Sequence, residues 1–329
     1  MGKHRPRTKR SIGTVGTVST VSSVDTVGII AFLVVSLTLL SVIVPPSRAG
    51  AQTTTTTATT TLGSSSNQPN PFRTGRTLVI AHSGGDALFP ENTLLAYERS
   101  TALGSEVIDI DVQTTADNVL VALHDPTVDR TTNATGSIRK LRWSAVAKLD
   151  AGYRFTSGKT FPFRKKGVTI PTIEAVLRRF PNSLVTLDLK DQRPAIAKPV
   201  CELITRLNRV STVYVGSDSN EQVVEFRSIC PELRTSGTSD ERRLMRAARE
   251  SGDTTFQTRQ LVSQPPFIGS DGRKRVTAET LAFSHALNIA VLTWVVDDPD
   301  DMRALIDLEV DGIYTRRPDL LAKLVKERR

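Results

Sequence analysis

The 329-residue sequence lacks the short motifs of several common enzyme classes. It contains no HExxH zinc-protease pair, no GxSxG nucleophile turn, no CxxC pair and no glycine pattern typical of dinucleotide binding. The segment 152–160, GYRFTSGKT, resembles a phosphate-binding loop, but its glycines are one residue too far apart and no strand precedes it. We therefore interpret 152–160 as an ordinary loop.

Charge is absent from residues 27–44, VGIIAFLVVSLTLLSVIV. A helix of this length, at about 1.5 Å per residue, is long enough to span a bilayer. The basic segment 1–25 precedes it, which orients the N-terminus toward the cytoplasm. Residues 49–51, Ala-Gly-Ala, follow it and form a small-x-small cleavage pattern. Residues 1–51 are therefore expected to be either a cleaved signal peptide or a retained membrane anchor.

Both alternatives place the remainder of the chain outside the cytoplasm, secreted or tethered to the membrane. Residues 52–72 are rich in Thr and Ser, which predicts a disordered linker. Residues 73–329 have the composition of one globular domain. The net charge is +9, but residues 1–51 supply six Lys and Arg against one Asp. The remainder shows no interleaving of aromatic and basic residues, so no nucleic acid partner is expected.

Strand patterns alternate with helical patterns after residue 73. This alternation predicts an α/β fold, and about eight units in about 250 residues favour a single (β/α)₈ TIM barrel over an open sheet. The strands are expected at 77–81, 106–112, 119–124, 184–189, 212–216, 233–236, 254–258, 290–296 and 310–314. The helices are expected at 92–103, 172–180, 193–209, 220–230, 240–251, 277–287 and 299–308.

One connection in the expected barrel is too short to contain a helix. Seven residues follow Asp111 before the next strand pattern begins, whereas a parallel crossover needs about a dozen or more. We therefore predict that the chain turns at Asp117-Asn118 and returns antiparallel through 119–124. The return places Asp111 and His124 at the same end of the barrel, which in this fold is the catalytic end.

The sequence has two cysteines, Cys201 and Cys230. Export would permit a disulfide between them. However, Cys201 falls in the first half of the helix expected at 193–209, and Cys230 ends the helix expected at 220–230. Neighbouring barrel helices run parallel, so the two Cα atoms should differ in height and lie beyond the roughly 7 Å that a disulfide tolerates. We therefore expect two buried free cysteines.

Two of the four histidines, His82 and His124, each end an apolar strand pattern, LVIAH and VLVALH. One such histidine alone would more often be a hydrogen-bonded structural residue. Two of them beside acidic residues favour acid–base catalysis. His285, on a predicted helix without an acidic neighbour in the sequence, is interpreted as structural.

Asp109 and Asp111 alternate along one predicted strand, so their side chains point to the same face. Two carboxylates there would repel each other and lose solvation unless a cation lies between them. Asp188, in VTLDL, adds a third acid, and a set of oxygen ligands favours Mg²⁺ or Ca²⁺ over zinc. Lys190 faces the same way and would balance charge or bind a phosphate. Each acid alone would be an ordinary solvated residue, but the three together predict a metal site.

Two further residues are candidate substrate contacts. Glu91 precedes Asn92 and Thr93, either of which would cap a helix, and its carboxylate would hydrogen-bond the substrate or reach the metal. Trp294 ends the last long strand and is either a core residue or the apolar wall of a substrate pocket.

The chain resembles the glycerophosphodiester phosphodiesterases over about residues 77–325. The matching blocks are IAHSGG, PENTLLAYERS, VIDIDVQTTADNVLVALHDPTVDRTTN, IPTIEAVL, VTLDLK and LTWVVDDPDDMRALIDLEVDGIYTRRPDLL. The resemblance implies a (β/α)₈ barrel, a divalent metal and hydrolysis of small-molecule phosphodiesters such as glycerophosphocholine to glycerol 3-phosphate and an alcohol. It also implies acid and base roles for the two histidines. By position, the histidines are His82 and His124, and metal binding is assigned to Asp109, Asp111 and Asp188. Lys190 matches a lysine of the family.

Three departures from the family pattern affect the expected site. Ser83 stands where the family has an arginine after the first histidine, so a phosphate-binding cation is missing. Asp109 and Asp188 stand where the family usually has the longer glutamate, and Arg316 replaces an acidic residue near the last strand. Phosphate binding would then pass to Arg130, to Arg316 or to the lysine after the third acid.

The sequence therefore predicts an exported, metal-dependent phosphodiesterase, and two alternatives remain. The first is a phospholipase D-like enzyme that acts on lysophospholipid or sphingomyelin. It would need an apolar rim, for which Phe89, Phe155, Phe161 and Phe163 are candidates. The second, suggested by Ser83, is a degenerate barrel that binds a phosphoryl ligand without turnover.

Overall fold

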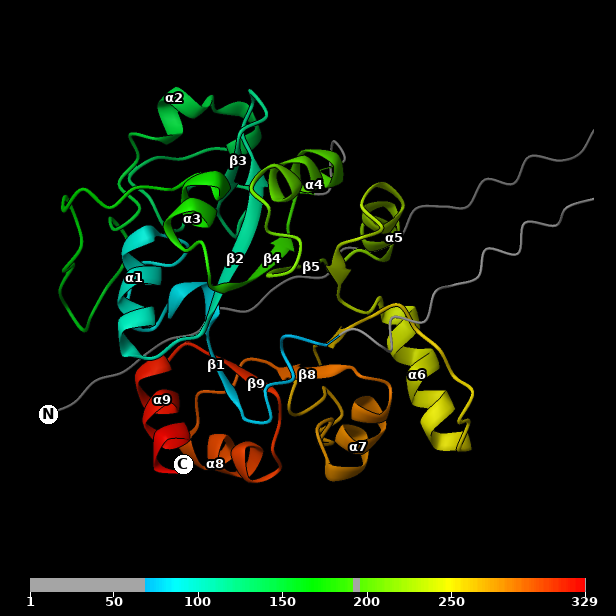
Figure 1. Cartoon of the computed structure of the whole chain (residues 1–329). Coiled ribbons are helices and arrows are strands. Elements are labelled where there is room, and N and C mark those ends of the chain that lie inside the picture. Colours follow the sequence, from blue (N-terminus) through cyan, green and yellow to red (C-terminus); the bar gives the residue numbers. More distant parts are fainter. Residues whose placement is uncertain (1–68, 192–195, 329) are drawn as a thin grey trace, which may run out of the picture. The chain divides into compact units, whose positions relative to one another are not determined.

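The computed structural model describes residues 69–191 and 196–328, and Figure 1 shows how their elements are arranged. The predicted signal or anchor, residues 1–51 with the apolar run 27–44, lies outside the described residues, as does most of the predicted linker. None of the helices in the described ranges is long and apolar enough to cross a membrane.

Eight parallel strands form the predicted (β/α)₈ barrel. Hydrogen-bonded neighbours follow the order β6-β5-β4-β2-β1-β9-β8-β7, and a parallel bridge between Ser236 and Val262 joins the two ends of this path. The prediction of a closed barrel is therefore confirmed. The strands are β1 (Leu78–Ala81), β2 (Val107–Thr114), β4 (Leu184–Leu189), β5 (Val213–Gly216), β6 (Arg234–Thr235), β7 (Val262–Ser263), β8 (Ala290–Thr293) and β9 (Gly312–Thr315).

Helices cover the outside of the barrel. Thr93 caps the first of them by accepting a hydrogen bond from the Ala96 amide, and Gly104 ends it in the left-handed conformation. The helices are α1 (Leu94–Leu103), α2 (Trp143–Val146), α3 (Ile173–Arg179), α4 (Ala197–Arg206), α5 (Asn220–Ile229), α6 (Ser239–Ser251), α7 (Ala278–Ala286), α8 (Pro299–Asp307) and α9 (Pro318–Glu327). The sequence patterns did not predict α2 and α9.

A short strand, β3 (Leu120–Ala122), pairs antiparallel with β2, as the short connection predicted. Asn118 adopts a left-handed φ of 60° at the turn, a conformation that Asn reaches more easily than most residues. The Leu123 amide donates to the Asp111 carbonyl at 3.0 Å. This bond holds the returning chain at the level of Asp111 and so brings His124 to the same end of the barrel.

The predicted strand at 254–258 is wrong. The seventh barrel strand is Val262–Ser263, and residues 254–258 have no strand structure. Their Thr and Phe side chains favour strands but none of them is buried, whereas Val262 is buried and pairs with Ala290 of β8. Burial against the neighbouring strand, and not local propensity, decides where β7 lies.

The prediction of two free cysteines is also wrong. Cys201 of α4 and Cys230, directly after α5, form a disulfide with a Cα–Cα distance of 5.9 Å. The prediction compared positions along two helices as if both began at the same height. Neighbouring elements of a barrel are staggered along its axis, so the middle of α4 lies beside the end of α5.

The barrel domain begins earlier than predicted. Phe72, which was assigned to the linker, is buried and packs edge-to-face on Tyr214 with ring centroids 5.8 Å apart. Asn70 is also buried, and its amide donates to the Leu261 carbonyl at 2.7 Å. The end of the predicted linker is therefore part of the folded core.

Candidate active site

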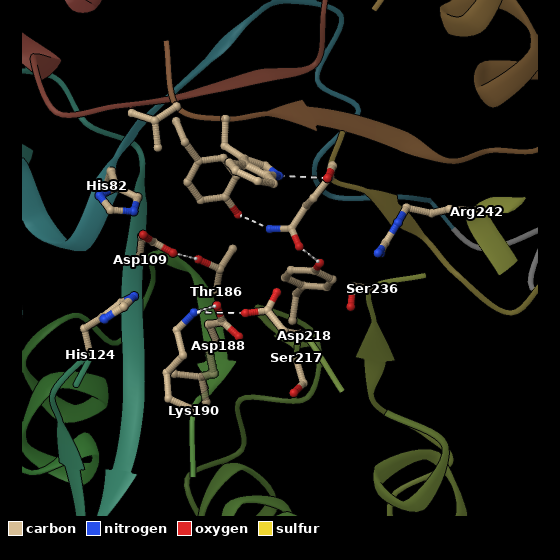
Figure 2. Close-up of a pocket in the computed structure, with 17 residues that line it drawn as sticks. His82, Asp109, His124, Thr186, Asp188, Lys190, Ser217, Asp218, Ser236 and Arg242 are labelled. Carbon is tan, nitrogen blue, oxygen red and sulfur yellow. Dashed lines mark hydrogen bonds and ion pairs between the residues drawn. The ribbon is translucent and has the colours of Figure 1, made fainter. Parts of the chain in front are cut away.

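Both predicted catalytic histidines, two of the three predicted metal ligands and the predicted substrate-binding lysine line one cavity at the carboxyl-terminal face of the barrel. The cavity has a volume of about 290 Å³, and its lining includes His82, Asp109, His124, Asp188 and Lys190 (Figure 2). Parallel strands in a closed barrel all direct their carboxyl ends to this face. The fold thereby brings together residues from three separate regions of the sequence. We refer to this space as the active-site cavity.

A tight turn after β1 positions His82. His82, Ser83 and Gly84 form a short 3-10 helix in which Ser83 has a left-handed φ of 47°. A Cβ on Gly84 would lie 2.8 Å from the Cβ of Ala96, so glycine is needed for this close approach to α1. The turn directs both the amide and the hydroxyl of Ser83 at the acidic residues of β2.

Ser83 holds both acidic residues of β2. Its amide donates to Asp109 Oδ2 at 2.9 Å, and its hydroxyl donates to Asp111 Oδ2 at 2.8 Å. Asp109 Oδ1 also accepts from the Thr186 hydroxyl at 2.7 Å, and Asp111 Oδ2 accepts from Asn92 Nδ2 at 2.8 Å. Ser83, which stands where the family has an arginine, therefore donates hydrogen bonds to two carboxylates.

The third acid lies on β4, beside the acids of β2. Asp188 is the register partner of Asp111, so the two side chains share a face. Lys190 Nζ lies 2.6 Å from Asp188 Oδ2 and 3.8 Å from Asp111 Oδ1. It also lies 3.6 Å from Asp218 Oδ2, a residue after β5 that the sequence patterns did not single out. Lys190 is thus shared among three carboxylates.

Burial and neighbouring charges shift several pKa values in this cavity. Burial lowers the pKa of His82, but the hydrogen bond to Asp86 and the charge of Asp109 outweigh it and raise the pKa to about 9. Loss of solvation raises the pKa of Asp188 to about 6, although Lys190 opposes this shift. Burial also raises the pKa of Asp109. His82 is therefore charged at neutral pH, while two carboxyl groups ionise less readily than in water.

A hydrogen-bonded network of charged side chains orients His124. Its Nδ1 lies 2.8 Å from Asp125 Oδ1. Asp125 Oδ2 in turn accepts from Arg130 Nε at 2.7 Å, and Arg130 also donates to both carboxylate oxygens of Glu91. Glu91 and Arg130, both predicted to contact substrate, thus pair with each other. Neither is among the described residues that line the active-site cavity.

Trp294 lines the active-site cavity with 46% of its surface exposed, which excludes the core alternative. Its Nε1 donates to the Gln264 carbonyl at 2.8 Å. The Gln264 side chain accepts from the Tyr214 hydroxyl at 2.8 Å and donates to the Tyr314 hydroxyl at 2.7 Å. The sequence patterns did not predict this hydrogen-bond network, because a single Gln and two separate Tyr residues carry no local signal.

Asp109, Asp111 and Asp188 are the residues that would hold a cation. Asp188 Oδ1 is buried without a hydrogen-bond partner, which leaves its lone pairs for a ligand. Within the described ranges, the one group of His, Cys, Asp or Glu side chains with ligand atoms within 4.8 Å of one another is Glu232 with the two disulfide cysteines. Those cysteines offer no thiolate. The three acids fit an oxygen-binding cation by donor type, and they would have to move closer together to share it.

The sequence and fold match known proteins. The model of the Glycerophosphoryl diester phosphodiesterase family matches residues 82–320. A glycerophosphodiester phosphodiesterase of Bacillus subtilis is 27% identical over 311 residues, covering 91% of this chain and 98% of the relative. One of Caldanaerobacter subterraneus subsp. tengcongensis is 30% identical over 257 residues, covering 77% of this chain and 99% of the relative. The crystal structure of glycerophosphodiester phosphodiesterase from Agrobacterium tumefaciens is 28% identical with a TM-score of 0.62, covering 75% of this chain and 99% of that one. The chain therefore belongs to the glycerophosphoryl diester phosphodiesterase family.

Proposed function

We propose that this protein hydrolyses glycerophosphodiesters to glycerol 3-phosphate and an alcohol. The observation that carries the proposal is that, in a member of this family, His82 and His124 line one cavity together with Asp109 (Figure 2). Hydrolysis of a phosphodiester needs one group to accept a proton and another to donate one, and a histidine pair can do both. Two relatives matched over nearly their whole length bear the name glycerophosphodiester phosphodiesterase, which supports this substrate class.

The two histidines have different surroundings, and these favour different roles. The pKa of about 9 keeps His82 protonated at neutral pH, so it is suited to protonate the oxygen of the departing alcohol. His124 is held through Nδ1 by Asp125, which leaves Nε2 to accept the proton of an attacking glycerol hydroxyl. Attack on phosphorus forms a cyclic phosphate, which water opens with the two roles reversed.

The proposal includes a divalent cation, Mg²⁺ or Ca²⁺, held by Asp109, Asp111 and Asp188. When bound, such an ion polarises the phosphoryl oxygens and lowers the pKa of the attacking hydroxyl. The buried, unpartnered Oδ1 of Asp188 supports this assignment. The raised pKa of the same carboxyl supports it too, because its charge is incompletely compensated by the protein alone.

We assign phosphate binding to Lys190 and Arg242, two cations that line the active-site cavity. The other candidates are not among the described residues that line this cavity: Arg130 pairs with Asp125 and Glu91, and Arg316 pairs with Asp297 at 2.6 Å. Arg242 has no carboxylate partner in the part of the chain that the structure describes, and it donates only to the Gly237 carbonyl. The sequence patterns missed Arg242, because it is one arginine of several on a polar helix.

The alternatives receive less support from the structure. Of the four phenylalanines that would form an apolar rim, none is among the described residues lining the active-site cavity. Ser83 suggested a degenerate barrel because it replaces an arginine. In the structure it instead holds two of the carboxylates that the reaction needs.

We also propose that the barrel is exported, with residues 1–51 as signal peptide or membrane anchor. The disulfide between Cys201 and Cys230 supports export, since disulfides persist mainly in oxidising compartments. N-terminal sequencing of protein from the medium and the membrane fraction distinguishes cleavage after Ala51 from a retained anchor. Recovery of the full-length chain as a soluble cytoplasmic protein would refute both.

The activity is tested by measuring glycerol 3-phosphate released from glycerophosphocholine, and lysophosphatidic acid released from lysophosphatidylcholine, with Mg²⁺, Ca²⁺ or a chelator. We expect turnover of the glycerophosphodiester, and a loss of about 10²–10⁴-fold in rate for His82→Ala and for His124→Ala. Lys198→Ala, at an exposed position of α4 that lines no cavity described above, is the matched control. Failure to release glycerol 3-phosphate from any diester with any of these metals would refute the proposal.

A further inference from the structure

A second and larger cavity lies outside the barrel wall. It has a volume of about 570 Å³, against about 290 Å³ for the active-site cavity. Helix α6 and the segment after β7 contribute most of its polar lining, and Phe283 of α7 and Val291 of β8 contribute apolar atoms. We call this space the basic cleft.

The basic cleft exists because α6 packs poorly on the barrel. Ala248 is the one buried residue of this 13-residue helix, and the remaining positions are mostly charged. A helix with so little apolar surface cannot seal the space between itself and the strands. Figure 1 shows α6 at the side of the barrel, next to α7 in the series of helices.

The charge of the basic cleft is strongly one-sided. Its lining includes seven Arg and Lys side chains and a single carboxylate, Glu250. Three of the cations pair with carboxylates. Arg242, Arg246, Arg273 and Lys274 have no such pair in the described residues. The lining of the basic cleft therefore has an excess of positive charge, which favours an anionic ligand.

The basic cleft adjoins the active-site cavity. Arg242 lines both spaces, and Figure 2 shows it at the edge of the active-site cavity beside Ser236. The end of β7 and the residues that follow it form the wall between them: Gln264 lines the active-site cavity, while Ser263 and Pro265 line the basic cleft. Arg242 is therefore a residue at which the two spaces meet.

We propose that the basic cleft binds a second phosphate group of the substrate, so that the preferred substrates are glycerophosphodiesters with at least two phosphates. This inference rests on the proposed function, whose substrate class it narrows. Arginine suits this role because its planar guanidinium donates two hydrogen bonds to one phosphate. One phosphodiester would lie at the histidines, and the second anionic group would lie among Arg246, Arg273 and Lys274.

The test compares two substrates on one double variant. Arg246→Ala/Arg273→Ala removes two cations that line the basic cleft but not the active-site cavity, and Lys198→Ala is the control. The substrates are glycerophosphoglycerol, with one phosphate, and bis(glycerophospho)glycerol, with two. We expect the double variant to lose about tenfold in kcat/KM on the two-phosphate substrate, mainly through KM. Its kcat/KM on the one-phosphate substrate should change by less than about twofold. Equal effects on both substrates, or no effect on either, would overturn the proposal.

Binding measurements separate this proposal from the proposed function. Calorimetric titration of bis(glycerophospho)glycerol into His124→Ala, with and without the two arginine substitutions, reports on the basic cleft whether or not the parent chain turns the compound over. We expect about tenfold weaker binding when the two arginines are removed. Phosphatidylglycerol vesicles test a lipid headgroup as the source of the phosphate. If the arginines affect vesicle binding but not binding of the soluble compound, the proposal is overturned.

Discussion

Ser83→Ala should destabilise the protein although it removes a single oxygen atom. Ser83 is 2% exposed, and its hydroxyl donates to Asp111 Oδ2 at 2.8 Å. A hydrogen bond to a charged group contributes about 1.5–3 kcal/mol, and a site this buried offers little room for a replacing water. Asp111 keeps its bond from Asn92, and the backbone bond to Asp109 survives. We therefore expect the free energy of unfolding to fall by about 2 kcal/mol.

Comparison of Ser83→Gly with Ser83→Ala tests the contribution of backbone strain at this position. It removes the same hydroxyl, but glycine adopts the left-handed φ of 47° without the strain that a Cβ imposes. Relief of that strain amounts to about 1 kcal/mol. Ser83→Gly should therefore be less destabilising than Ser83→Ala, even though it is the larger truncation.

Urea denaturation followed by tryptophan fluorescence measures both variants, with Asp111→Asn added to complete a double-mutant cycle. A coupling free energy of about 1 kcal/mol or more between Ser83 and Asp111 would support the assigned hydrogen bond. A free energy of unfolding for Ser83→Ala within about 0.5 kcal/mol of the parent, the usual range for an uninvolved surface residue, would contradict the assigned hydrogen bond.

Three further predictions concern pH, metal and the disulfide. The pKa of His82 is raised to about 9, so its proton is present at neutral pH and activity should fall as pH rises through about 9; His82→Ala should lack this limb of the pH–rate profile. Chelation should abolish activity, and Mg²⁺ or Ca²⁺ should restore it and raise Tm. Because the pKa of Asp188 is about 6 without metal, protons compete with the ion and the gain in Tm should shrink from pH 7.5 to pH 5; an equal gain at both values would contradict the metal assignment. Cys201→Ser/Cys230→Ser opens a loop with a sequence separation of 29 and should lower the free energy of unfolding by about 3–4 kcal/mol, with a smaller effect on kcat; unchanged stability in urea would refute this.

The contrast between β3 and β7 shows which parts of the fold can be predicted from the sequence. The return through β3 follows from the number of residues after Asp111, since a short connection excludes a crossover helix. The position of β7 depends on burial of Val262 beside Ala290, a contact between segments that are 28 residues apart. Local propensity favoured residues 254–258 instead, none of which is buried, and carried no information about that contact.

The same distinction applies to the candidate site: its residues can be predicted from the sequence, but their contacts cannot. His82, Asp109, Asp111, His124 and Asp188 are identifiable because each lies at a fixed position in a strand pattern, and parallel strands align their ends. Their partners are not identifiable in this way. The pairing of Arg130 with Glu91 joins residues 39 positions apart, and the pairing of His285 with Asp311 joins residues 26 apart.

The sequence by itself therefore determined the barrel, the end of the barrel that carries the site, and the residue types of the site, because strand periodicity and connection length are local properties. The tertiary structure alone decided what each side chain contacts. It turned Ser83 into the hydrogen-bond partner of two carboxylates, paired Cys201 with Cys230, and placed Arg242 between two cavities. Those outcomes depend on the stagger of strands and the packing of helices, which no local pattern encodes.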